Sequence, residues 1–310
     1  MTTGSTTIGV DLGGTKVLVA PVDADGNAGE REKMDTPRGG PRSVVDAIVG
    51  MIGALDLPPL PVGIGTPGMV RSDGTVVHAP NLAGWEGEVP LGAMLREALP
   101  GRAIVVENDV NAATLGEHLH GAAAGRDDLL CVFVGTGVGG GMVLDGRLRR
   151  GPRGMTGEIG HVITGGDRVC GCGLAGHLEA YAGRRGLETE ARRRIAAGQP
   201  SLLAELAGDQ RMKSGIFLKA WEAGDPLAVA LIDEAVQALA VAMASAAMLI
   251  DLDLIVVGGG LAEKFGARML NPLRTAVADR VYPGQRLDVV PAALGDNAGV
   301  VGAAGLVATG

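Results

Sequence analysis

The residues from Gly157 to Glu179 combine metal-ligand side chains with carboxylates in a glycine-rich stretch of the chain. Four of them are potential ligands: His161, Cys170, Cys172 and His177. Zinc is bound by thiolate and imidazole groups, usually four of them in a closed tetrahedron when its role is structural. Ligands this close in sequence close short loops, so bringing them together costs little chain entropy. The spacing therefore predicts a metal site. The alternative is a reduced cysteine pair in a turn, with a histidine exposed on a helix.

A second chemical feature is Glu107-Asn-Asp109, where an apolar stretch ends just before a predicted helix. A carboxylate at this point can cap the helix. It can also face the carboxyl end of a sheet, where α/β proteins bind ligands. An amide next to a carboxylate suits a polyol, because the carboxylate takes a hydroxyl proton while the amide orients the ring. Phosphoryl transfer needs such a base near the attacking hydroxyl, so Asp109 is the candidate base.

Other polar residues could contact the hydroxyl groups of a sugar. They are Asn81, Asn108, Glu158, His161 and Glu179. Trp85, close to the first of them, is interpreted as a half-buried packing residue.

Three glycine clusters each follow a predicted strand, at 13–14, 135–141 and 258–260. Glycine lets the backbone approach a ligand closely and point several N–H groups at phosphate oxygens. The stretch Gly135–Gly140 matches Gly-X-Gly-X-X-Gly, but a dinucleotide fingerprint requires a helix after the glycines and a strand is predicted here. Ordinary turn glycines are the alternative for each cluster alone. Three clusters together, two of them with threonine, indicate a nucleotide polyphosphate.

Individual groups in these clusters have separate expected roles. Asp11 could hold Mg²⁺ or its water shell, Thr15 and Thr136 supply hydroxyl donors, and Lys16 supplies a cation. The predicted backbone contacts to the nucleotide are Gly13, Gly14, Gly137, Gly139, Gly140 and Gly259.

The elements that must position these groups are short apolar strands and longer periodic helices. Strands are predicted at Ile8–Val10, Val17–Val22, Val62–Ile64, Ala103–Val106, Leu129–Val134, Met142–Leu144 and Leu254–Val257. Helices are predicted at Ser43–Leu55, Asn111–Gly121, Arg184–Ala197, Met212–Ala223, Pro226–Ile250, Asn271–Val281 and Asn297–Val307. Two strand–turn–strand units with glycine-threonine turns recur about 120 residues apart, which indicates an internal duplication.

Composition limits the class of protein. A chain of 310 residues with 46% hydrophobic residues is long enough for two domains or one large α/β unit. Its net charge of −8 counts against binding to nucleic acid or to an anionic membrane surface. The apolar stretch Ala238–Ile250 is too short to span a bilayer and predicts a buried helix. Cys131 is expected to be a buried small hydrophobe. No secretory signal is recognisable at the N-terminus, so the cytoplasm is the expected location.

Taken together, these motifs resemble the family of bacterial repressors, open reading frames and sugar kinases known as ROK. The matching motifs are Asp11-Leu-Gly-Gly-Thr-Lys16, Gly65-Thr-Pro-Gly68, Asn81-Leu-Ala-Gly-Trp85, Glu107-Asn-Asp109, Gly135–Gly141, Gly157-Glu-Ile-Gly-His161 and Cys170-Gly-Cys172-Gly. The resemblance implies an actin-like ATPase (ribonuclease H-like) fold with two α/β domains flanking a cleft. The smaller domain would comprise residues 1–110 and 297–310, and the larger one 111–296 with the zinc loop. A homodimer or homotetramer is also implied.

The resemblance further implies ATP- and Mg²⁺-dependent phosphorylation of the 6-hydroxyl of a hexose, with Asp109 as the base. The residues it implies for holding the sugar are Gly68, Asn81, Asn108, Glu158, His161 and Glu179. In such kinases the histidine of Glu-Ile-Gly-His binds zinc through one ring nitrogen and the sugar through the other. The family usually has a cysteine where this chain has His177. Either His177 completes a Cys₂His₂ site, or the zinc is weakened or absent.

Substrate and donor remain open at this level. Glucose is favoured because Thr156–Val162 resembles the glucokinase form of that segment, but kinases for N-acetylmannosamine, N-acetylglucosamine, mannose and fructose share most of these residues. Polyphosphate users also occur among the relatives. A sugar-sensing repressor is disfavoured, because the first hairpin begins by about residue 6 and leaves no room for a DNA-binding domain. A non-catalytic sugar-binding protein is disfavoured by the presence of Asp11 and Asp109.

Overall fold

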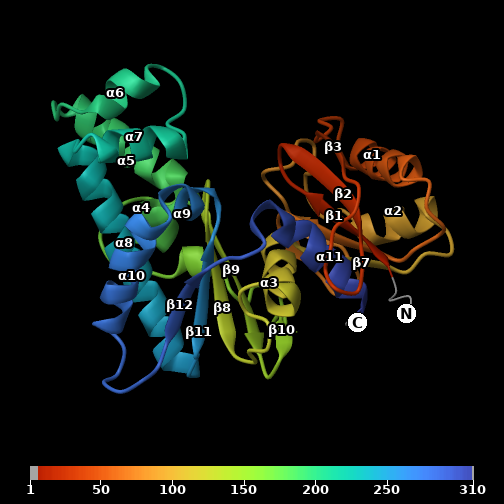
Figure 1. Ribbon diagram of the computed structural model, residues 1–310. Coiled ribbons are helices and arrows are strands. Elements are labelled where there is room, and N and C mark those ends of the chain that lie inside the picture. Colours follow the sequence, from red (N-terminus) through yellow and green to blue (C-terminus); the bar gives the residue numbers. More distant parts are fainter. Residues whose placement is uncertain (1–5, 309–310) are drawn as a thin grey trace. The chain divides into compact units, whose positions relative to one another are not determined.

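The computed structural model describes residues 6–308, and its contacts divide the chain into two compact units. Unit 1 runs to Asp127 and also contains Gly141–Thr156 and the chain from Ala293 onward, whereas unit 2 contains Asp128–Gly140 and Gly157–Ala292. This division corrects the boundary expected at residue 110. The segments 111–127 and 141–156 belong to unit 1, because helix α3 (Asp109–His120) packs along helix α11 (Ala298–Ala308), as Figure 1 shows.

Unit 1 is built on a five-stranded sheet in the order β3-β2-β1-β4-β7. Its strands are β1 (Thr7–Leu12), β2 (Lys16–Val22), β3 (Glu32–Asp35), β4 (Val62–Thr66) and β7 (Ile104–Asn108). The pairs β3–β2 and β2–β1 are antiparallel, and β1, β4 and β7 run parallel. The remaining elements are α1 (Pro41–Ala54), the small sheet of β5 (Met69–Val70) and β6 (Val76–His78), α2 (Leu91–Ala98), and the 3-10 helix η2 (Gly295–Asn297).

Helix α11 lies directly on the centre of this sheet because glycines leave room for it. A Cβ atom on Gly9 of β1 would lie 1.9 Å from the carbonyl oxygen of Val300, and one on Gly63 of β4 would lie 1.7 Å from that of Ala303. Distances this short are not possible between real atoms, so only glycine fits at both positions. A separate core of buried aliphatic side chains joins the sheet to α1 and α2, and it includes Trp85. Trp85 is therefore a packing residue as expected, but it is buried (6% exposed) rather than half-buried.

Unit 2 contains most of a second five-stranded sheet, in the order β10-β9-β8-β11-β12. The strands are β8 (Leu129–Val134), β9 (Val138–Leu144), β10 (Arg147–Arg149), β11 (Leu254–Gly258) and β12 (Asp288–Pro291), and the division between units falls inside β9. Strand β11 is parallel to both β8 and β12. Cys131 is fully buried in β8, as expected.

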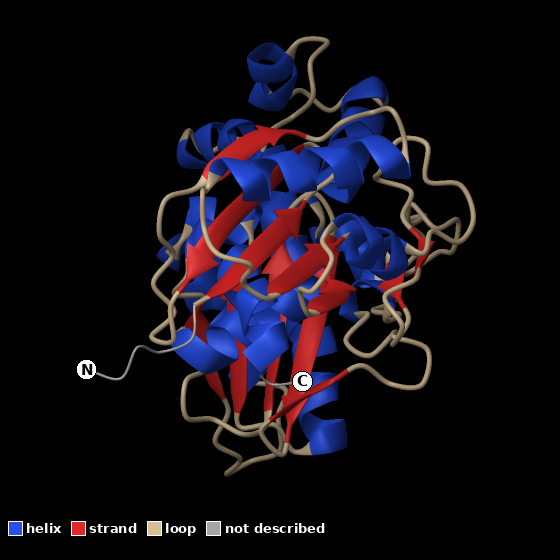
Figure 2. Cartoon of the chain, turned by 90° about the vertical axis from the view of Figure 1, so that its right-hand side faces the viewer, coloured by secondary structure: helices blue, strands red, loops and turns tan. Residues whose placement is uncertain are grey.

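Most helices of unit 2 lie between β9 and β11 in sequence, and the last two lie between β11 and β12. Figure 2 shows helices in blue and strands in red. The helices of unit 2 are the 3-10 helix η1 (Ile159–His161), α4 (Leu178–Ala182), α5 (Arg184–Ala196), α6 (Leu202–Ala207), α7 (Ser214–Glu222), α8 (Pro226–Ile250), α9 (Gly260–Phe265) and α10 (Ala267–Ala278). Within the described residues, α8 alone has the length and mean hydropathy to cross a membrane, and 67% of its most apolar window is buried against the rest of the protein. The helix predicted at Pro226–Ile250 is confirmed with these bounds, and it packs as a core helix.

Candidate active site

Three parallel strands of unit 1 end at the same edge of the sheet, and the predicted acidic residues lie there. Asp11 of β1 is in register with Gly65 of β4, which is in register with Glu107 of β7. Adjacent strands are about 4.8 Å apart, so the backbones of β1 and β7 are separated by about 10 Å at this edge. The structure therefore brings Asp11 and the Glu107-Asn-Asp109 segment together, as their positions after apolar strands suggested.

Asn108 and Asp109 form the start of helix α3, where each has a defined role. Asn108 is the N-cap: its Oδ1 accepts hydrogen bonds from the N–H groups of Val110 (2.9 Å) and Asn111 (3.1 Å). Its Nδ2 donates to the carbonyl oxygen of Gly68 at 3.0 Å. Asp109 is the first helical residue, and its Oδ1 accepts from the N–H of Val110 at 2.9 Å. The helix cap is therefore the amide, which leaves the half-buried carboxylate at the edge of the sheet.

Gly68 itself adopts a positive φ of 101° in the turn between β4 and β5. A Cβ at this position would lie 1.9 Å from the carbonyl oxygen of His78. The tight turn therefore requires glycine at this position. The same turn directs the carbonyl group of Gly68 towards Asn108.

The sequence assigned no role to Glu107, yet this carboxylate organises the whole segment. It is 3% exposed, and its Oε1 accepts hydrogen bonds from the N–H of Asn108 (2.8 Å) and from Nδ2 of Asn111 (3.0 Å). Its Oε2 pairs with the guanidinium of Arg150. Arg150 follows β10 and is 43 residues away in sequence, so no local pattern could have revealed the pair.

Asp11 lies at the N-terminal end of helix α11. A Cβ on Gly299 would be 2.7 Å from its carboxylate, so glycine is needed for this approach. Burial, and to a lesser extent the nearby Asp296, raises the pKa of Asp11 to about 6. A carboxylate held in this way is stabilised by a divalent cation, because the cation favours the ionised form.

The turn between β1 and β2 carries the other predicted nucleotide contacts of unit 1. Gly14, Thr15 and Lys16 are exposed, while Gly13 closes the turn by donating its N–H to the carbonyl oxygen of Lys16 at 2.8 Å. The Asn81 loop packs on this turn: a Cβ on Gly14 would lie 2.7 Å from the carbonyl oxygen of Asn81. The structure therefore places a predicted sugar contact next to a predicted phosphate contact.

Two glycine clusters also meet at one edge in unit 2. Strands β8 and β11 are parallel neighbours, and Gly258 is in register with Phe133, so the residues 135–137 and 258–260 follow adjacent strand ends. Gly259 has a φ of 88°, and a Cβ there would lie 2.6 Å from the backbone nitrogen of Val134. Proximity to the neighbouring strand is therefore enough to require glycine at this position.

The second glycine-threonine turn is shorter than the sequence suggested. Only Gly135, Thr136 and Gly137 form it, because Gly139 and Gly140 already belong to strand β9. At Gly140 a Cβ would lie 2.6 Å from the carbonyl oxygen of Gly157, so glycine is needed there by the segment crossing over β9. The expectation of a turn over 135–141 is thus wrong for its second half.

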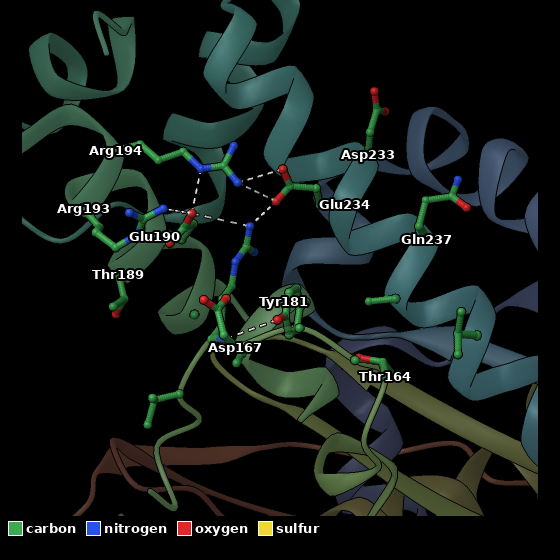
Figure 3. Close-up of a pocket in the computed structure, with 18 residues that line it drawn as sticks. Thr164, Asp167, Tyr181, Thr189, Glu190, Arg193, Arg194, Asp233, Glu234 and Gln237 are labelled. Carbon is green, nitrogen blue, oxygen red and sulfur yellow. Dashed lines mark hydrogen bonds and ion pairs between the residues drawn. The ribbon is translucent and has the colours of Figure 1, made fainter. Parts of the chain in front are cut away.

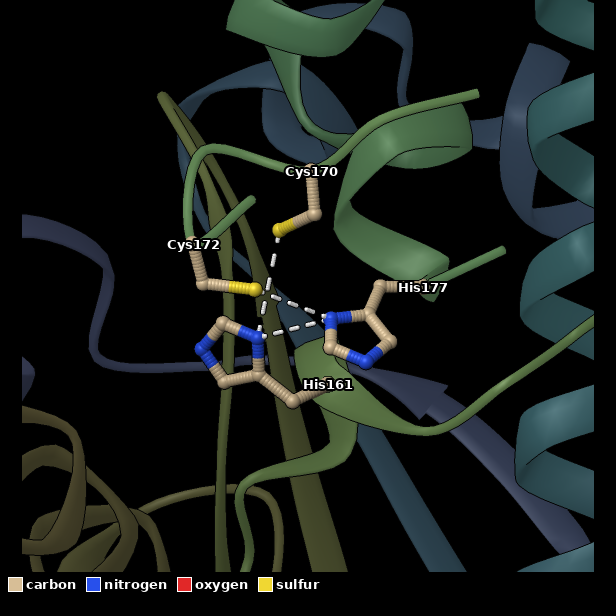
Figure 4. Close-up of side chains that lie close together, drawn as sticks. All are labelled: His161, Cys170, Cys172 and His177. Carbon is tan, nitrogen blue, oxygen red and sulfur yellow. Dashed lines mark hydrogen bonds between the residues drawn. The ribbon is translucent and has the colours of Figure 1, made fainter. Parts of the chain in front are cut away.

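The four predicted metal ligands lie together in unit 2, as Figure 4 shows. Their potential ligand atoms are all within 4.8 Å of one another. The Nδ1 atoms of His161 and His177 are 3.3 Å apart, and Sγ of Cys172 is 3.2 Å from Nδ1 of His177. Sγ of Cys170 is 3.9 Å from Nδ1 of His161. With bonds of about 2.0–2.3 Å, ligand atoms around a tetrahedral zinc ion are about 3.3–3.8 Å apart, so this donor set fits zinc. Burial raises the pKa of the Cys170 thiol to about 11, which a bound cation would oppose.

The remaining predicted sugar contacts flank this cluster. Oε2 of Glu158 is 3.9 Å from Nε2 of His161, whereas Nδ1 of the same ring faces the other three potential ligands. Glu179 lies in the first turn of α4, and its Oε2 accepts a hydrogen bond from the N–H of Val138 at 3.0 Å. The cluster and both carboxylates therefore form one connected group of side chains in unit 2.

Comparison with protein families identifies the chain. The model of the ROK family matches residues 7–309. The chain belongs to the ROK family. It is 38% identical to a glucokinase of Streptomyces coelicolor over 97% of this chain and 96% of that protein. It is 32% identical to an N-acetylmannosamine kinase of Escherichia coli over 96% of this chain and 97% of that one.

A solved ROK structure shows the same fold as this chain. The structure is a glucokinase from Streptomyces griseus in complex with glucose and AMPPNP, with a TM-score of 0.82 and 35% identity over 99% of this chain and 100% of that one. This ROK protein therefore has the actin-like ATPase fold that the sequence motifs implied.

A large cavity in unit 2 of this ROK protein is lined by none of the predicted site residues. It has a volume of about 1020 Å³ and lies in unit 2 between α5, α8 and the segment 164–169 (Figure 3). Its wall is an ion-pair network in which Arg168 and Arg194 both contact Glu190 and Glu234. Hydrogen bonds from Arg193, and then from Arg194, lower the pKa of Glu190 to about 2. Because its charged groups pair mainly with one another, we do not assign the reaction to this cavity.

Proposed function

We propose that this protein is an ATP-dependent hexose kinase that phosphorylates the 6-hydroxyl of its sugar. The observation that carries the proposal is the position of Asp109, at the sheet edge that also carries Asp11, in a chain with 38% identity to a glucokinase. Phosphoryl transfer depends mainly on positioning and on neutralising charge, with a base near the attacking oxygen. The residues at this edge match those requirements.

In the proposed reaction, Asp109 accepts the proton of the 6-hydroxyl as that oxygen bonds to the γ-phosphorus and ADP leaves. Asn108 fixes the start of α3 through its own hydrogen bonds, so the base is held by a capped helix rather than a mobile loop. The carboxylate of Glu107 further fixes this helix start, because it accepts a hydrogen bond from the N–H of Asn108. Gly68, Asn81, Asn108, Glu158, His161 and Glu179 are the proposed contacts to the hexose.

The nucleotide contacts are proposed from the glycine turns. Gly13, Gly14, Thr15, Lys16, Thr136, Gly137, Gly139, Gly140 and Gly259 are the proposed phosphate-binding residues. Asp11 is the proposed holder of Mg²⁺, directly or through its water shell, and the cation would neutralise phosphate charge. The half-buried position of Asp11 and its raised pKa support this role, because each makes an uncompensated carboxylate costly.

We propose that His161, Cys170, Cys172 and His177 bind a structural zinc ion. The distances between their ligand atoms support a Cys₂His₂ site in which His177 stands where the family usually has a cysteine. A metal on Nδ1 would fix the ring of His161, leaving Nε2 to face Glu158 and the sugar. Metal analysis of the purified protein at neutral pH should find about one zinc per chain. His177→Ala should lose it, and less than about a tenth of an equivalent in the native protein would contradict the site.

Glucose is the proposed substrate, and N-acetylmannosamine is the main alternative. The similarity to glucokinases supports glucose, whereas the 32% identity to an N-acetylmannosamine kinase keeps that sugar in consideration. The two sugars differ at carbon 2, where an acetamido group needs extra space. The further alternative substrates are N-acetylglucosamine, mannose and fructose. We also propose ATP as the donor, a cytoplasmic location, and a homodimer or homotetramer.

Initial-rate kinetics with ATP over these five sugars test the proposal. Coupled detection of ADP should give the highest kcat/KM with glucose, and turnover should require Mg²⁺. A higher kcat/KM with N-acetylmannosamine would make that sugar the substrate in place of glucose, and the proposed role of Asp109 would be unchanged. Absence of ADP formation with every hexose, from ATP and from polyphosphate alike, would overturn the proposed activity.

A further inference from the structure

Glu179 makes contacts that a sugar ligand alone would not need. Its Oε2 accepts the N–H of Val138 at 3.0 Å, at the end of the second glycine-threonine turn. Its Oε1 lies 3.7 Å from Sγ of Cys170, one of the candidate metal ligands. The carboxylate thus bridges the metal cluster and the glycine turn, two features that the sequence treated as separate.

The rest of the turn is held by the residues that follow Glu179. The N–H groups of Arg184 and Arg185 donate to the carbonyl oxygens of Gly135 and Thr136, both at 3.0 Å. The guanidinium of Arg184 also donates to Oγ1 of Thr136 at 3.1 Å. Every residue of the turn is therefore in contact with the corner between α4 and α5. At Gly137 this contact is so close that a Cβ would lie 2.1 Å from Oε2 of Glu179.

The same corner begins at a candidate metal ligand. His177 is the N-cap residue of α4, and only Leu178 separates it from Glu179. Leu178 is fully buried, so the first turn of α4 has little freedom to move independently of its ends. A metal that fixes His177 would also fix the backbone carrying Glu179, and through it the N–H of Val138.

We propose that Glu179 is a positioning residue that couples the metal cluster to the nucleotide-binding turn. This inference rests on the proposed function, in which residues 136–140 contact the phosphates of ATP. Its consequence is that the metal cluster supports nucleotide binding as well as hexose binding. If Glu179 acted only on the sugar, its removal would affect hexose binding and leave nucleotide binding unchanged.

The test separates these two roles with three variants, measured on protein purified with its metal. Glu179→Ala removes the acceptor of the Val138 N–H, Glu179→Gln keeps an acceptor oxygen, and Glu158→Gln alters a carboxylate that contacts His161 but not the turn. The readouts are the Kd of a non-hydrolysable ATP analogue without sugar, the hexose KM, and hydrogen exchange in residues 135–140. Zinc content is determined for each variant.

Glu179→Ala should weaken nucleotide binding by about tenfold, the usual consequence of leaving one buried donor unpaired, and should speed exchange in 135–140. Glu179→Gln should recover nucleotide affinity to within about threefold of wild type, because an amide oxygen accepts the same N–H. Glu158→Gln should raise only the hexose KM. Wild-type nucleotide affinity and exchange in Glu179→Ala would overturn the inference.

Removal of the metal provides an independent test of the coupling through Glu179. Chelation of the wild-type protein should weaken binding of the same analogue and speed exchange in 135–140, and added Zn²⁺ should reverse both effects. Chelation should have a smaller effect on Glu179→Ala, in which the bridge is already missing. If the wild-type protein binds no nucleotide under any condition, the proposed function fails instead, so the two failures are distinguishable.

Discussion

The two sheets of this protein have the same strand order but present different chemistry at their edges. In the first sheet, β3-β2-β1-β4-β7, three strands that are consecutive in sequence are followed by two strands parallel to β1. The order β10-β9-β8-β11-β12 repeats this arrangement of three consecutive and two later strands. The shared order agrees with the internal duplication inferred from the two glycine-threonine turns. The first edge carries carboxylates, Asp11 and Asp109, whereas the second carries backbone N–H groups around Gly135–Gly137. One scaffold can therefore position either ionised side chains or uncharged donors.

The difference lies in what holds each edge in place. In unit 1, backbone N–H groups donate hydrogen bonds to the side chains of Asn108 and Glu107, and these bonds fix the start of α3. In unit 2, the α4–α5 corner holds the turn through Arg184, Arg185 and Glu179. The first arrangement suits a base that must keep one orientation, and the second suits a turn whose donors bind phosphate. Four substitutions, at Asp109, Asp11, Gly50 and Gly186, test this comparison.

The largest expected effect comes from Asp109, the proposed base at the first edge. Asp109→Asn should lower kcat by at least ~10²-fold, the usual scale for losing a positioned base. The amide has nearly the same shape, so hexose affinity should stay within about tenfold. Steady-state kinetics together with equilibrium hexose binding measure both. A variant that turns over at nearly the wild-type rate would show that Asp109 is not the base. The catalytic role assigned to the edge of the first sheet would then be wrong.

A smaller effect is expected at Asp11, where function and stability should oppose each other. Its pKa is raised from 3.8 to about 6 in the folded protein, so between these values the native state binds the proton more tightly than the unfolded state. Stability therefore falls as pH rises from about 4 to 6, and the ionised group costs up to about 3 kcal/mol at neutral pH. Asp11→Asn should raise the free energy of unfolding of the cation-free protein by about 1–3 kcal/mol at pH 7, while lowering kinase activity.

Denaturant unfolding at several pH values checks this prediction. The difference between variant and wild type should shrink as the pH falls through about 6 to below 4, where Asp11 becomes protonated in both states. Mg²⁺ with ATP should stabilise the wild type more than the variant, because only the wild type retains the carboxylate. A variant less stable than the wild type at pH 7 would contradict the cost assigned to Asp11.

The sequence predicted the strands that carry the site because each is a short, fully apolar run. Residues 8–10, 62–64, 129–134 and 254–257 all lie in strands of the structure. The polar strand β3 and the five-residue helix α4 were missed, since neither has a periodic apolar pattern of useful length. Tertiary contacts determine both, and α4 matters most because it carries Glu179.

Site residues were predictable where their chemistry is local. The four metal-ligand types lie within 17 residues of one another, and the structure brings their ligand atoms together. The pairing of Glu107 with Arg150 joins segments far apart in the sequence, so it became visible only in the fold. Asn108 stays a predicted sugar contact, but the sequence did not reveal that its amide also bonds the backbone at both ends. A residue type thus indicates which bonds are available, and packing decides which are made.

The smallest expected effect concerns glycines that have no role at either edge. Gly50 lies on the exposed side of α1, and a Cβ there would meet no atom within 4 Å. Alanine costs less backbone entropy than glycine in a helix, so Gly50→Ala should raise the free energy of unfolding by about 0.5–1 kcal/mol and leave activity unchanged. Gly186 in α5 of unit 2 is the matched control. A Cβ there would lie 2.5 Å from the carbonyl oxygen of Ala180, so Gly186→Ala should destabilise the protein by displacing α4. Denaturant unfolding measures the free energy of unfolding of both variants, which should rise for Gly50→Ala and fall for Gly186→Ala. Equal stabilisation by the two substitutions would show that the α4–α5 corner is not tightly packed.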